Sequence, residues 1–184
     1  MGFALASAAA EAGAKVTLVS GPTGQTIDHE SVRLINVQSA EEMYQSCIKH
    51  FPDCTIGIMA AAVADYTASD YSDRKIRRKD SDLILHLKPT RDIAAELGKR
   101  KTKKQILVGF ALETGNGRSS AREKMVRKNF DFMVLNSLED KGAGFGTDTN
   151  KITIIDRNNN LTEYGLKDKR NVAEDIIVKL LEYV

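Results

Sequence analysis

Small and acidic residues follow an apolar run in the segment 59–66 (MAAAVADY), the first place where this sequence could do chemistry. The alanines after Met59, beginning with Ala60 and Ala61, would let a ligand approach the backbone. The carboxylate of Asp65 can accept two hydrogen bonds from the hydroxyls of a sugar. A plain strand end capped by an aspartate would have the same pattern, so this segment alone leaves both interpretations open.

A run of cations forms the second candidate, in the segment 75–79 (KIRRK) that begins with Lys75. Such a run can close over a polyphosphate and neutralise the charge that develops on a pyrophosphate leaving group, which is the main task in nucleotidyl transfer. A solvated surface run is the competing interpretation.

The third candidate joins the segment 109–114 (GFALET) to a predicted helix that carries Lys124 and Lys128. The two lysines are four residues apart, so they share one helix face and can reach a common phosphate. An ordinary wet helix face would look the same. A further cationic run at 99–104 (KRKTKK) is interpreted as complementing a helix C-terminus, because no aromatic residues interleave it as a nucleic-acid surface would require.

The common phosphate-binding motifs are missing from the sequence. It has neither a Gly-x-Gly-x-x-Gly turn after a strand nor a Walker lysine loop, and the spaced glycines in 142–150 (GAGFGTDTN) are interpreted as a turn because no helix follows them. The histidines at positions 29, 50 and 86 form no metal-ligand or catalytic-triad pattern. We therefore expect no histidine catalysis and no protein metal ligands.

Composition limits the classes of protein further. The chain has 184 residues, 42% of them apolar, and a net charge of +2, which predicts one globular domain and no general affinity for nucleic acid or anionic membranes. The longest apolar runs are too short to span a bilayer, and the N-terminus lacks a secretory leader. Cys47 and Cys54 are too few for a disulfide scaffold, so we expect a cytoplasmic protein with reduced thiols.

Alternating apolar and helix-period runs predict an α/β domain with a mostly parallel sheet. A doubly wound domain normally opens with a strand and a glycine turn, whereas this sequence begins with a helix, so we expect the first strand and loop to be missing; an ordinary domain that starts with a helix is the alternative. A long loop is expected at 65–82, with 55–62 as a central strand. The expected helices are 2–12, 39–51, 90–101, 119–128 and 168–183, and the expected strands are 15–20, 33–37, 55–62, 83–88, 105–112 and 131–136, with a hairpin at 152–156 and 161–164.

Six motifs in register resemble the bacterial phosphopantothenate-cysteine ligase family, over nearly the whole chain: AAAVADY, KIRR, KPTRDI, GFALET, KMVRKNFDFMVLN and FGTDTN. That family is the synthetase half of a bifunctional coenzyme A biosynthesis protein whose other half is a flavin-dependent decarboxylase. The resemblance implies a three-layer, Rossmann-like α/β fold with a mostly parallel sheet, helices on both faces and an antiparallel hairpin extension. It also implies a single nucleotide-binding domain over residues 1–184 that is truncated at its N-terminus.

The reaction that this resemblance implies has two steps. The carboxylate of 4′-phosphopantothenate attacks the α-phosphate of CTP, and the amine of cysteine then displaces CMP to give 4′-phosphopantothenoylcysteine. A catalytically incomplete fragment that dimerises and binds nucleotide without turnover is the alternative function. A nucleic-acid binder and a nicotinamide-dependent oxidoreductase are weaker rivals, because the net charge is small and the dinucleotide fingerprint is absent.

The family's site residues carry over position by position. Lys75 and Lys124 would be catalytic, Asp65 would bind the ribose, Lys75 would clamp the phosphates and Phe110 would pack near the nucleotide. The segment from Thr90 to Ile93 would line the base pocket, with Lys124 and Lys128 on its cationic side. The full set of implied nucleotide-binding residues is Met59, Ala60, Ala61, Asp65, Lys75, Thr90, Arg91, Asp92, Ile93, Phe110, Lys124 and Lys128.

Two departures from the family pattern accompany the resemblance. The family's Lys-x-Lys-Lys motif is KIRR in this sequence, beginning at Lys75. The change keeps the positive charge but replaces two compact ammonium groups by planar guanidinium groups. The family's first strand and its Asn- and Ser-containing phosphate loop are expected before Met1. The resemblance further implies Mg²⁺ with the CTP, no FMN on this chain, and a homodimer that pairs through an arm at 66–88; neither nucleic acid nor membrane is an expected partner.

Overall fold

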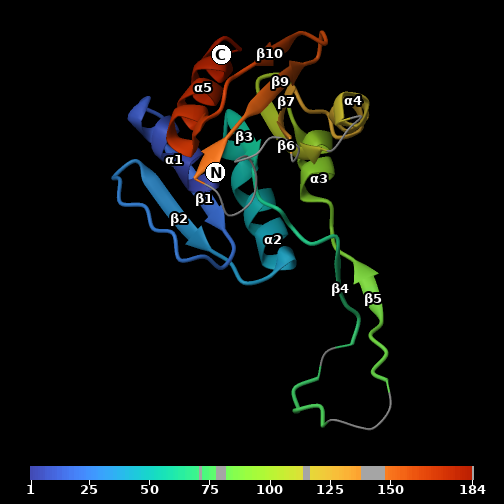
Figure 1. Cartoon of the computed structure of the whole chain (residues 1–184). Helices are drawn as coiled ribbons and strands as arrows, with labels where there is room; N and C mark the ends of the chain where they lie inside the picture. The colour runs from blue at the N-terminus through green and yellow to red at the C-terminus, as the bar shows by residue number, and fades with distance from the viewer. Residues whose placement is uncertain (71, 78–81, 114–116, 138–147, 184) are drawn as a thin grey trace.

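The chain folds as an α/β domain in which helices cover both faces of a mostly parallel sheet, as the sequence predicts (Figure 1). The structure is a computed structural model, and it describes residues 1–70, 72–77, 82–113, 117–137 and 148–183. No helix within these described ranges has both the length and the apolar character to cross a membrane. The glycine turn expected at 142–150 falls mostly outside the described residues, which resume at 148.

The main sheet has five strands in the order β10-β9-β7-β6-β3. Three of them are parallel: β3 (Ile56–Met59), β6 (Ile106–Glu113) and β7 (Phe132–Ser137). The hairpin of β9 (Ile152–Asp156) and β10 (Leu161–Glu163) continues the sheet in antiparallel fashion. These five strands therefore confirm the parallel sheet with an antiparallel hairpin extension.

A second, two-stranded parallel sheet is formed by β1 (Val16–Ser20) and β2 (Val32–Asn36). The expectation of a central strand over 55–62 is wrong in two respects. The strand β3 ends at Met59, and it lies at the end of the five-stranded sheet rather than in its middle. The reason is that β3 pairs with β6 alone among the described residues, so only one edge of it is held by hydrogen bonds.

Helices cover the two faces of the sheet in separate groups. On one face α1 (Gly2–Glu11) and α5 (Lys169–Leu181) bury residues such as Leu5 and Ile176 against β6, β7 and β9. On the other face lie α2 (Ala40–His50), α3 (Ile93–Arg100) and α4 (Gly117–Arg127), with Phe51–Asp53 forming a short 3₁₀ turn, η1, after α2. The chain therefore forms the three layers that the sequence analysis expects.

Side-chain caps fix the starts of three helices. Ser39, Asp92 and Asp168 each accept a hydrogen bond from a backbone N–H in the first turn of α2, α3 and α5 respectively. Glu42 in turn accepts the backbone N–H of Gln38, the residue before the cap, which further ties the entering chain to the first turn of α2. The helix expected over 90–101 is correct in kind but begins three residues late, because Thr90 makes tertiary hydrogen bonds and Asp92 takes the capping position.

An arm projects from the body of the domain between β4 (Tyr66–Ala68) and β5 (Leu87–Pro89), which pair with each other in antiparallel fashion (Figure 1). The strand expected over 83–88 is therefore wrong for Leu83 to His86, which form no strand. A segment with strand-like residues forms a strand only where it can pair with a neighbouring strand. Here the apolar side chains of this segment remain exposed. Another short pair, β8 (Thr149–Asn150) with β11 (Lys167–Asp168), lies before α5.

A partly buried carboxylate, that of Asp131, ties together the amino ends of β6 and β7. Asp131 Oδ2 accepts the Nζ of Lys101 at 2.6 Å and the N–H of Leu107 at 2.6 Å, and Oδ1 lies 3.3 Å from the Nε of Arg157. The side chain of Lys101 is only 7% exposed, so its charge depends on this partner.

The turn of the β9–β10 hairpin is organised by a second carboxylate, Asp156. Its oxygens accept hydrogen bonds from the N–H groups of Asn158 and Asn160, from the Asn160 side chain, and from the hydroxyl of Tyr183 near the C-terminus. Burial acts to raise the pKa of Asp156, but these hydrogen bonds outweigh it and hold the pKa below its ordinary value. The ionised form is therefore the one that the fold stabilises.

We expect Asp156 to make the fold acid-sensitive. Because its folded pKa is lowered, its contribution to stability is complete above the unfolded pKa of about 3.9 and is lost as the pH falls through the folded value. Asp156→Asn should lower the free energy of unfolding by about 1–2 kcal/mol at pH 7 and by less at pH 3. Urea unfolding of both proteins at the two pH values measures this, and an equal difference at both would contradict the assignment.

Candidate functional site

The carboxyl ends of the parallel strands meet at one edge of the main sheet, where open α/β folds bind ligands. Met59, the last residue of β3, pairs with Gly109, so the alanines that follow Met59 lie beside the later residues of β6. The strand β7 ends at the same edge. Ala60 and Ala61 therefore follow the sheet edge at which the sequence analysis places a ligand.

The base of the arm fixes Asp65 beside Thr90. The Thr90 hydroxyl donates to the carbonyl oxygen of Ala64 at 2.7 Å, and the Thr90 N–H donates to the carbonyl oxygen of Asp65 at 2.9 Å. Residues 25 positions apart in the sequence are thus held side by side, and the Asp65 side chain stays exposed. The structure brings together two of the segments that the resemblance implicates.

The start of α3 binds one of the two candidate lysines. Asp92 caps the helix through the N–H of Ala95 and also accepts the Nζ of Lys128 at 3.0 Å. Partial burial acts to raise the pKa of Asp92, but the hydrogen bonds from Ala95 and Lys128, with the charges of Lys128 and Arg127, outweigh it and lower the pKa. Asp92 is therefore an anion that holds Lys128 beside the N-terminus of α3.

Close packing of two backbones keeps Lys128 in this place. A Cβ atom on Gly98 in α3 would collide with the backbone carbonyl oxygen of Lys128, and the side-chain amide of Asn129 donates to the carbonyl oxygen of Gly98 at 2.7 Å. Asn129 itself has a positive φ of 55°. The glycine thus lets the end of α4 pack against α3, which positions Lys128 for Asp92.

Arg91 faces a part of the site that the sequence analysis does not include. Its guanidinium lies over the ring of Tyr44, 4.7 Å from the centroid, and its Nε lies 3.4 Å from Oε2 of Glu41. Both partners belong to the first half of α2. Ile93, in contrast, is buried at 8% exposure in the core between the helices and the sheet, so its side chain supports the segment from below rather than lining an open pocket.

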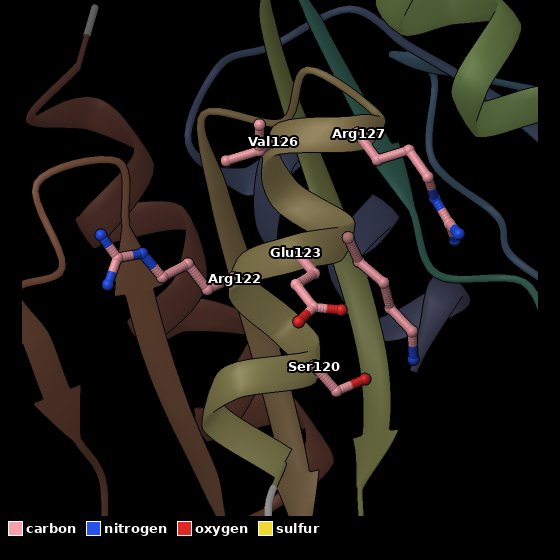
Figure 2. Close-up of a pocket in the computed structure, with 6 residues that line it drawn as sticks. Ser120, Arg122, Glu123, Val126 and Arg127 are labelled. Carbon is pink, nitrogen blue, oxygen red and sulfur yellow. The ribbon is translucent and has the colours of Figure 1, made fainter.

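An open hollow follows the outer surface of α4 and includes Lys124 (Figure 2). Figure 2 shows the side chains of Arg122 and Arg127 pointing to opposite sides of the helix, with Ser120 and Glu123 between them. Lys128 follows Lys124 by one turn, and its N–H donates to the Lys124 carbonyl oxygen at 2.9 Å. The end of α4 therefore presents several cations.

Two candidate residues lie apart from this group. Phe110 packs on the opposite face of the sheet, against the core beneath α1 and α5. Lys75 lies on the arm, whose outer segment extends away from the sheet edge (Figure 1). Arg78, Lys79 and Thr114, which the sequence motifs include, fall outside the described residues.

The sequence analysis does not include a pair of side-chain amides at the end of β7. Asn150, only 3% exposed, donates from its side-chain nitrogen to Oδ1 of Asn136 at 3.0 Å. Asn136 is a polar residue near the carboxyl end of an apolar strand, so the rule that selects Asp65 also applies to it. Asn150, its partner on β8, lies next to Asn136 only because of the tertiary fold.

Comparison with known proteins gives one family over almost the whole chain. The sequence model of the DNA/pantothenate metabolism flavoprotein C-terminal domain matches residues 1–183. The chain is 53% identical over 184 residues to a cysteine/cysteine sulfinic acid decarboxylase from an unknown prokaryotic organism, covering 100% of this chain and 51% of that protein. It is 41% identical over 180 residues to the coenzyme A biosynthesis bifunctional protein CoaBC of Bacillus subtilis (strain 168), covering 98% of this chain and 44% of the relative.

Solved structures agree with this assignment of the fold. A crystal structure of the C-terminal domain of CoaBC superposes with a TM-score of 0.81 at 35% identity, covering 99% of this chain and 82% of that one. The DNA/pantothenate metabolism flavoprotein from Streptococcus pneumoniae has the same TM-score at 18% identity, which shows a shared fold. The chain spans about half the length of the curated relatives it matches.

Proposed function

The chain belongs to the family of the DNA/pantothenate metabolism flavoprotein C-terminal domain, and from this premise we propose that it ligates 4′-phosphopantothenate to cysteine with CTP in coenzyme A biosynthesis. The observation that carries the proposal is the pairing of Asp65 with Thr90 at the base of the arm, two residues before Asp92, which holds Lys128. The CoaBC name of the Bacillus subtilis relative supports it. The decarboxylase name belongs to a protein of which this chain covers 51%.

The first step forms an acyl-cytidylate. A carboxylate oxygen of 4′-phosphopantothenate attacks the α-phosphorus of CTP, the bond between the α- and β-phosphates breaks, and pyrophosphate leaves. A carboxylate is already ionised at pH 7, so this step needs no general base. The chain contributes by positioning the reactants and by neutralising charge, for which Lys75, Lys124 and Lys128 supply ammonium groups.

In the second step the amine of cysteine attacks the acyl carbon of the cytidylate. A carbon–nitrogen bond forms, the bond to the phosphate oxygen breaks, CMP leaves and the amine loses a proton. We assign Asp65 to the ribose hydroxyls, because its carboxylate is exposed at the sheet edge while its backbone is held by Thr90. The backbone between Met59 and Asp65 would contact the base and sugar.

Mg²⁺ fits this site as a companion of the triphosphate. Within the described residues no three carboxylate, imidazole or thiol side chains gather as a metal site would require. Mg²⁺ keeps several waters and binds mainly through substrate phosphates in such enzymes, and it would neutralise the triphosphate charge when bound. FMN belongs, in our proposal, to a separate decarboxylase domain and not to this chain.

The arm supports the proposal of a homodimer. It exposes apolar side chains that the described part of the chain leaves uncovered, and it carries Lys75 away from the other site residues. Pairing of two arms would bury this surface and bring Lys75 to a site on the second copy. Among the described residues of the arm, the exposed large apolar side chains are Tyr66, Ile76, Leu83, Ile84, Leu85 and Leu87.

We expect the double substitution Ile84→Asp and Leu85→Asp to convert the dimer to a monomer. These side chains are 77% and 64% exposed, so the change does not disturb the core of the domain. Light scattering coupled to size exclusion measures the mass, and circular dichroism checks the fold. Val178→Asp on the outer face of α5, where the side chain is 63% exposed, is the matched control and should leave the mass unchanged. A wild-type monomer at all concentrations would contradict the proposal.

Product formation tests the proposed function. The chain is incubated with CTP, Mg²⁺, 4′-phosphopantothenate and cysteine, and mass spectrometry follows 4′-phosphopantothenoylcysteine. A second preparation is a chimera in which this chain replaces the matched region of the Bacillus subtilis CoaBC protein. The chimera therefore also contains the remainder of that relative. We expect CTP-dependent product in the second preparation. Nucleotide binding without product in both would favour the alternative, a domain that binds nucleotide without turnover.

A further inference from the structure

Three consecutive residues between the arm and α3 contact three different parts of the fold. The N–H of Thr90 donates to the carbonyl oxygen of Asp65 at the base of the arm, at 2.9 Å. The carboxylate of Asp92 accepts the Nζ of Lys128 at the end of α4, at 3.0 Å. The side chain of Arg91, between them, contacts α2. This short segment therefore joins the arm, α2 and α4.

The first contact of Arg91 is with the ring of Tyr44. The guanidinium carbon lies 4.7 Å from the ring centroid, within the range of cation–π attraction. Tyr44 is partly buried and packs against the core cluster that contains Met43 and Leu97, so the ring is held in place by the core. A guanidinium over a ring held in this way has less freedom than an arginine side chain in solvent.

The second contact of Arg91 is an exposed ion pair. Its Nε lies 3.4 Å from Oε2 of Glu41, and the two side chains are 57% and 54% exposed. The other carboxylate oxygen of Glu41 accepts the Nε2 of Gln45 at 2.7 Å, which orients the carboxylate. Exposed ion pairs contribute little to stability and weaken as salt is added. We therefore expect Tyr44, rather than Glu41, to provide most of the attachment of Arg91 to α2.

The position of Arg91 bears on the nucleotide through its two neighbours. Under the proposed function, Asp65 binds the ribose and Lys128 helps to neutralise the phosphates. Thr90 holds the first of these residues and Asp92 holds the second, so the segment between them sets how far apart the two groups lie. The contact of Arg91 with α2 fixes the middle of this segment.

We propose that Tyr44 is a positioning residue for the nucleotide, because it holds Arg91 and thereby the segment that joins Asp65 to Lys128 in the arrangement that binds CTP. This role in CTP binding rests on the proposed function. Tyr44 acts through Arg91 and is not itself assigned a contact with the substrates. Loss of the ring should therefore weaken the binding of CTP and leave the turnover number at saturating CTP unchanged.

Two substitutions of Tyr44 separate the ring from its apolar volume. Tyr44→Leu keeps an apolar side chain against the core but removes the ring, whereas Tyr44→Phe keeps the ring. Equilibrium dialysis of CTP against the full chain measures the Kd without turnover. We expect the Kd to rise about five- to tenfold in Tyr44→Leu and to stay within about twofold of wild type in Tyr44→Phe. In the chimera with the Bacillus subtilis CoaBC protein, both variants should keep kcat and the KM for 4′-phosphopantothenate within about twofold.

A double-mutant cycle tests whether Tyr44 acts through Arg91. Arg91→Ala should raise the Kd for CTP at least as much as Tyr44→Leu does, and the double variant should bind no more weakly than Arg91→Ala alone. Glu41→Gln should raise the Kd by less than about twofold relative to wild type, and about 0.5 M KCl should remove that difference. Arg100→Ala is the matched control, because Arg100 pairs with Glu96 at the other end of α3, and it should leave the Kd unchanged.

Three results would overturn the positioning role. They are an unchanged Kd for CTP in Tyr44→Leu, equal losses in Tyr44→Leu and Tyr44→Phe, and additive losses in the cycle with Arg91→Ala. A proportional rise in the KM for 4′-phosphopantothenate, with a lower midpoint of urea unfolding, would make Tyr44 a structural residue only and also overturn it. CTP binding that depends on Tyr44 without product formation would contradict the ligation alone. No binding of CTP by the wild-type chain would contradict both.

Discussion

Lys75→Ala should lower the turnover number at saturating CTP by about 10²–10³-fold, or roughly 2.7–4 kcal/mol of transition-state stabilisation. The reason is that charge develops on the departing pyrophosphate, and the ammonium of Lys75 is proposed to neutralise it. Stopped assays of pyrophosphate release, on protein that elutes as a dimer, measure the change. Lys103→Ala, which removes an exposed lysine from the turn before β6, is the matched control and should keep wild-type turnover.

A mixing experiment tests whether Lys75 acts on the second copy. Lys124→Ala is expected to inactivate the site in its own chain, and Lys75→Ala the site in its partner. Random mixing makes half of the dimers mixed, and one of the two sites in each mixed dimer would carry neither substitution, so activity returns to about a quarter of wild type. No recovery in the mixture would show that Lys75 serves its own chain. Wild-type turnover in Lys75→Ala would contradict the phosphate clamp altogether.

Asp131→Ala should lower the free energy of unfolding by about 3–5 kcal/mol. The substitution leaves the charge of Lys101 buried without its partner and also removes the acceptor of the Leu107 N–H. Urea unfolding at pH 7 measures the change. Because this pair lies at the amino ends of β6 and β7, the variant that remains folded at low temperature should still bind CTP.

Arg157→Ala is the comparison for Asp131. Arg157 lies 3.3 Å from the same carboxylate and also donates to the carbonyl oxygen of Phe130 at 2.8 Å, but its side chain is 48% exposed, so its removal should cost about 1–2 kcal/mol, less than that of Asp131. Equal effects of the two substitutions would contradict the view that the buried Lys101 charge dominates the network. The double variant of Asp131 and Arg157 should show a smaller loss than the sum, since the two residues contact each other.

Much of the fold follows from periodicity in the sequence. The boundaries of α1, α2 and α5 and of the β9–β10 hairpin match the expected ranges within about two residues, because apolar spacing and capping residues act locally. The expected strands were wrong where strand formation depends on pairing with a neighbouring strand. The alternating residues 83–86 lie on the arm and meet no sheet edge, and β3 ends at Met59 where its pairing with β6 ends.

The candidate site was predictable in part for a similar reason. A polar residue at a strand end is visible in the sequence, which is how Asp65 was selected, and the same rule would have selected Asn136. The pairing of Thr90 with Asp65 and the stacking of Arg91 on Tyr44 depend on tertiary structure, because the partners are far apart in the chain. The roles of Lys75, Lys124 and Phe110 stay predictions, since they lie on separate parts of the fold.

Release of pyrophosphate before cysteine is added tests the central claim most directly. The protein used is the chimera in which this chain replaces the matched region of the Bacillus subtilis CoaBC protein. It is mixed with Mg²⁺, 4′-phosphopantothenate and either CTP or ATP. We predict about one pyrophosphate per site with CTP, far less with ATP, and CMP release only after cysteine follows. Pyrophosphate release that requires cysteine from the start, or that proceeds equally with ATP, would contradict a CTP-dependent acyl-cytidylate mechanism.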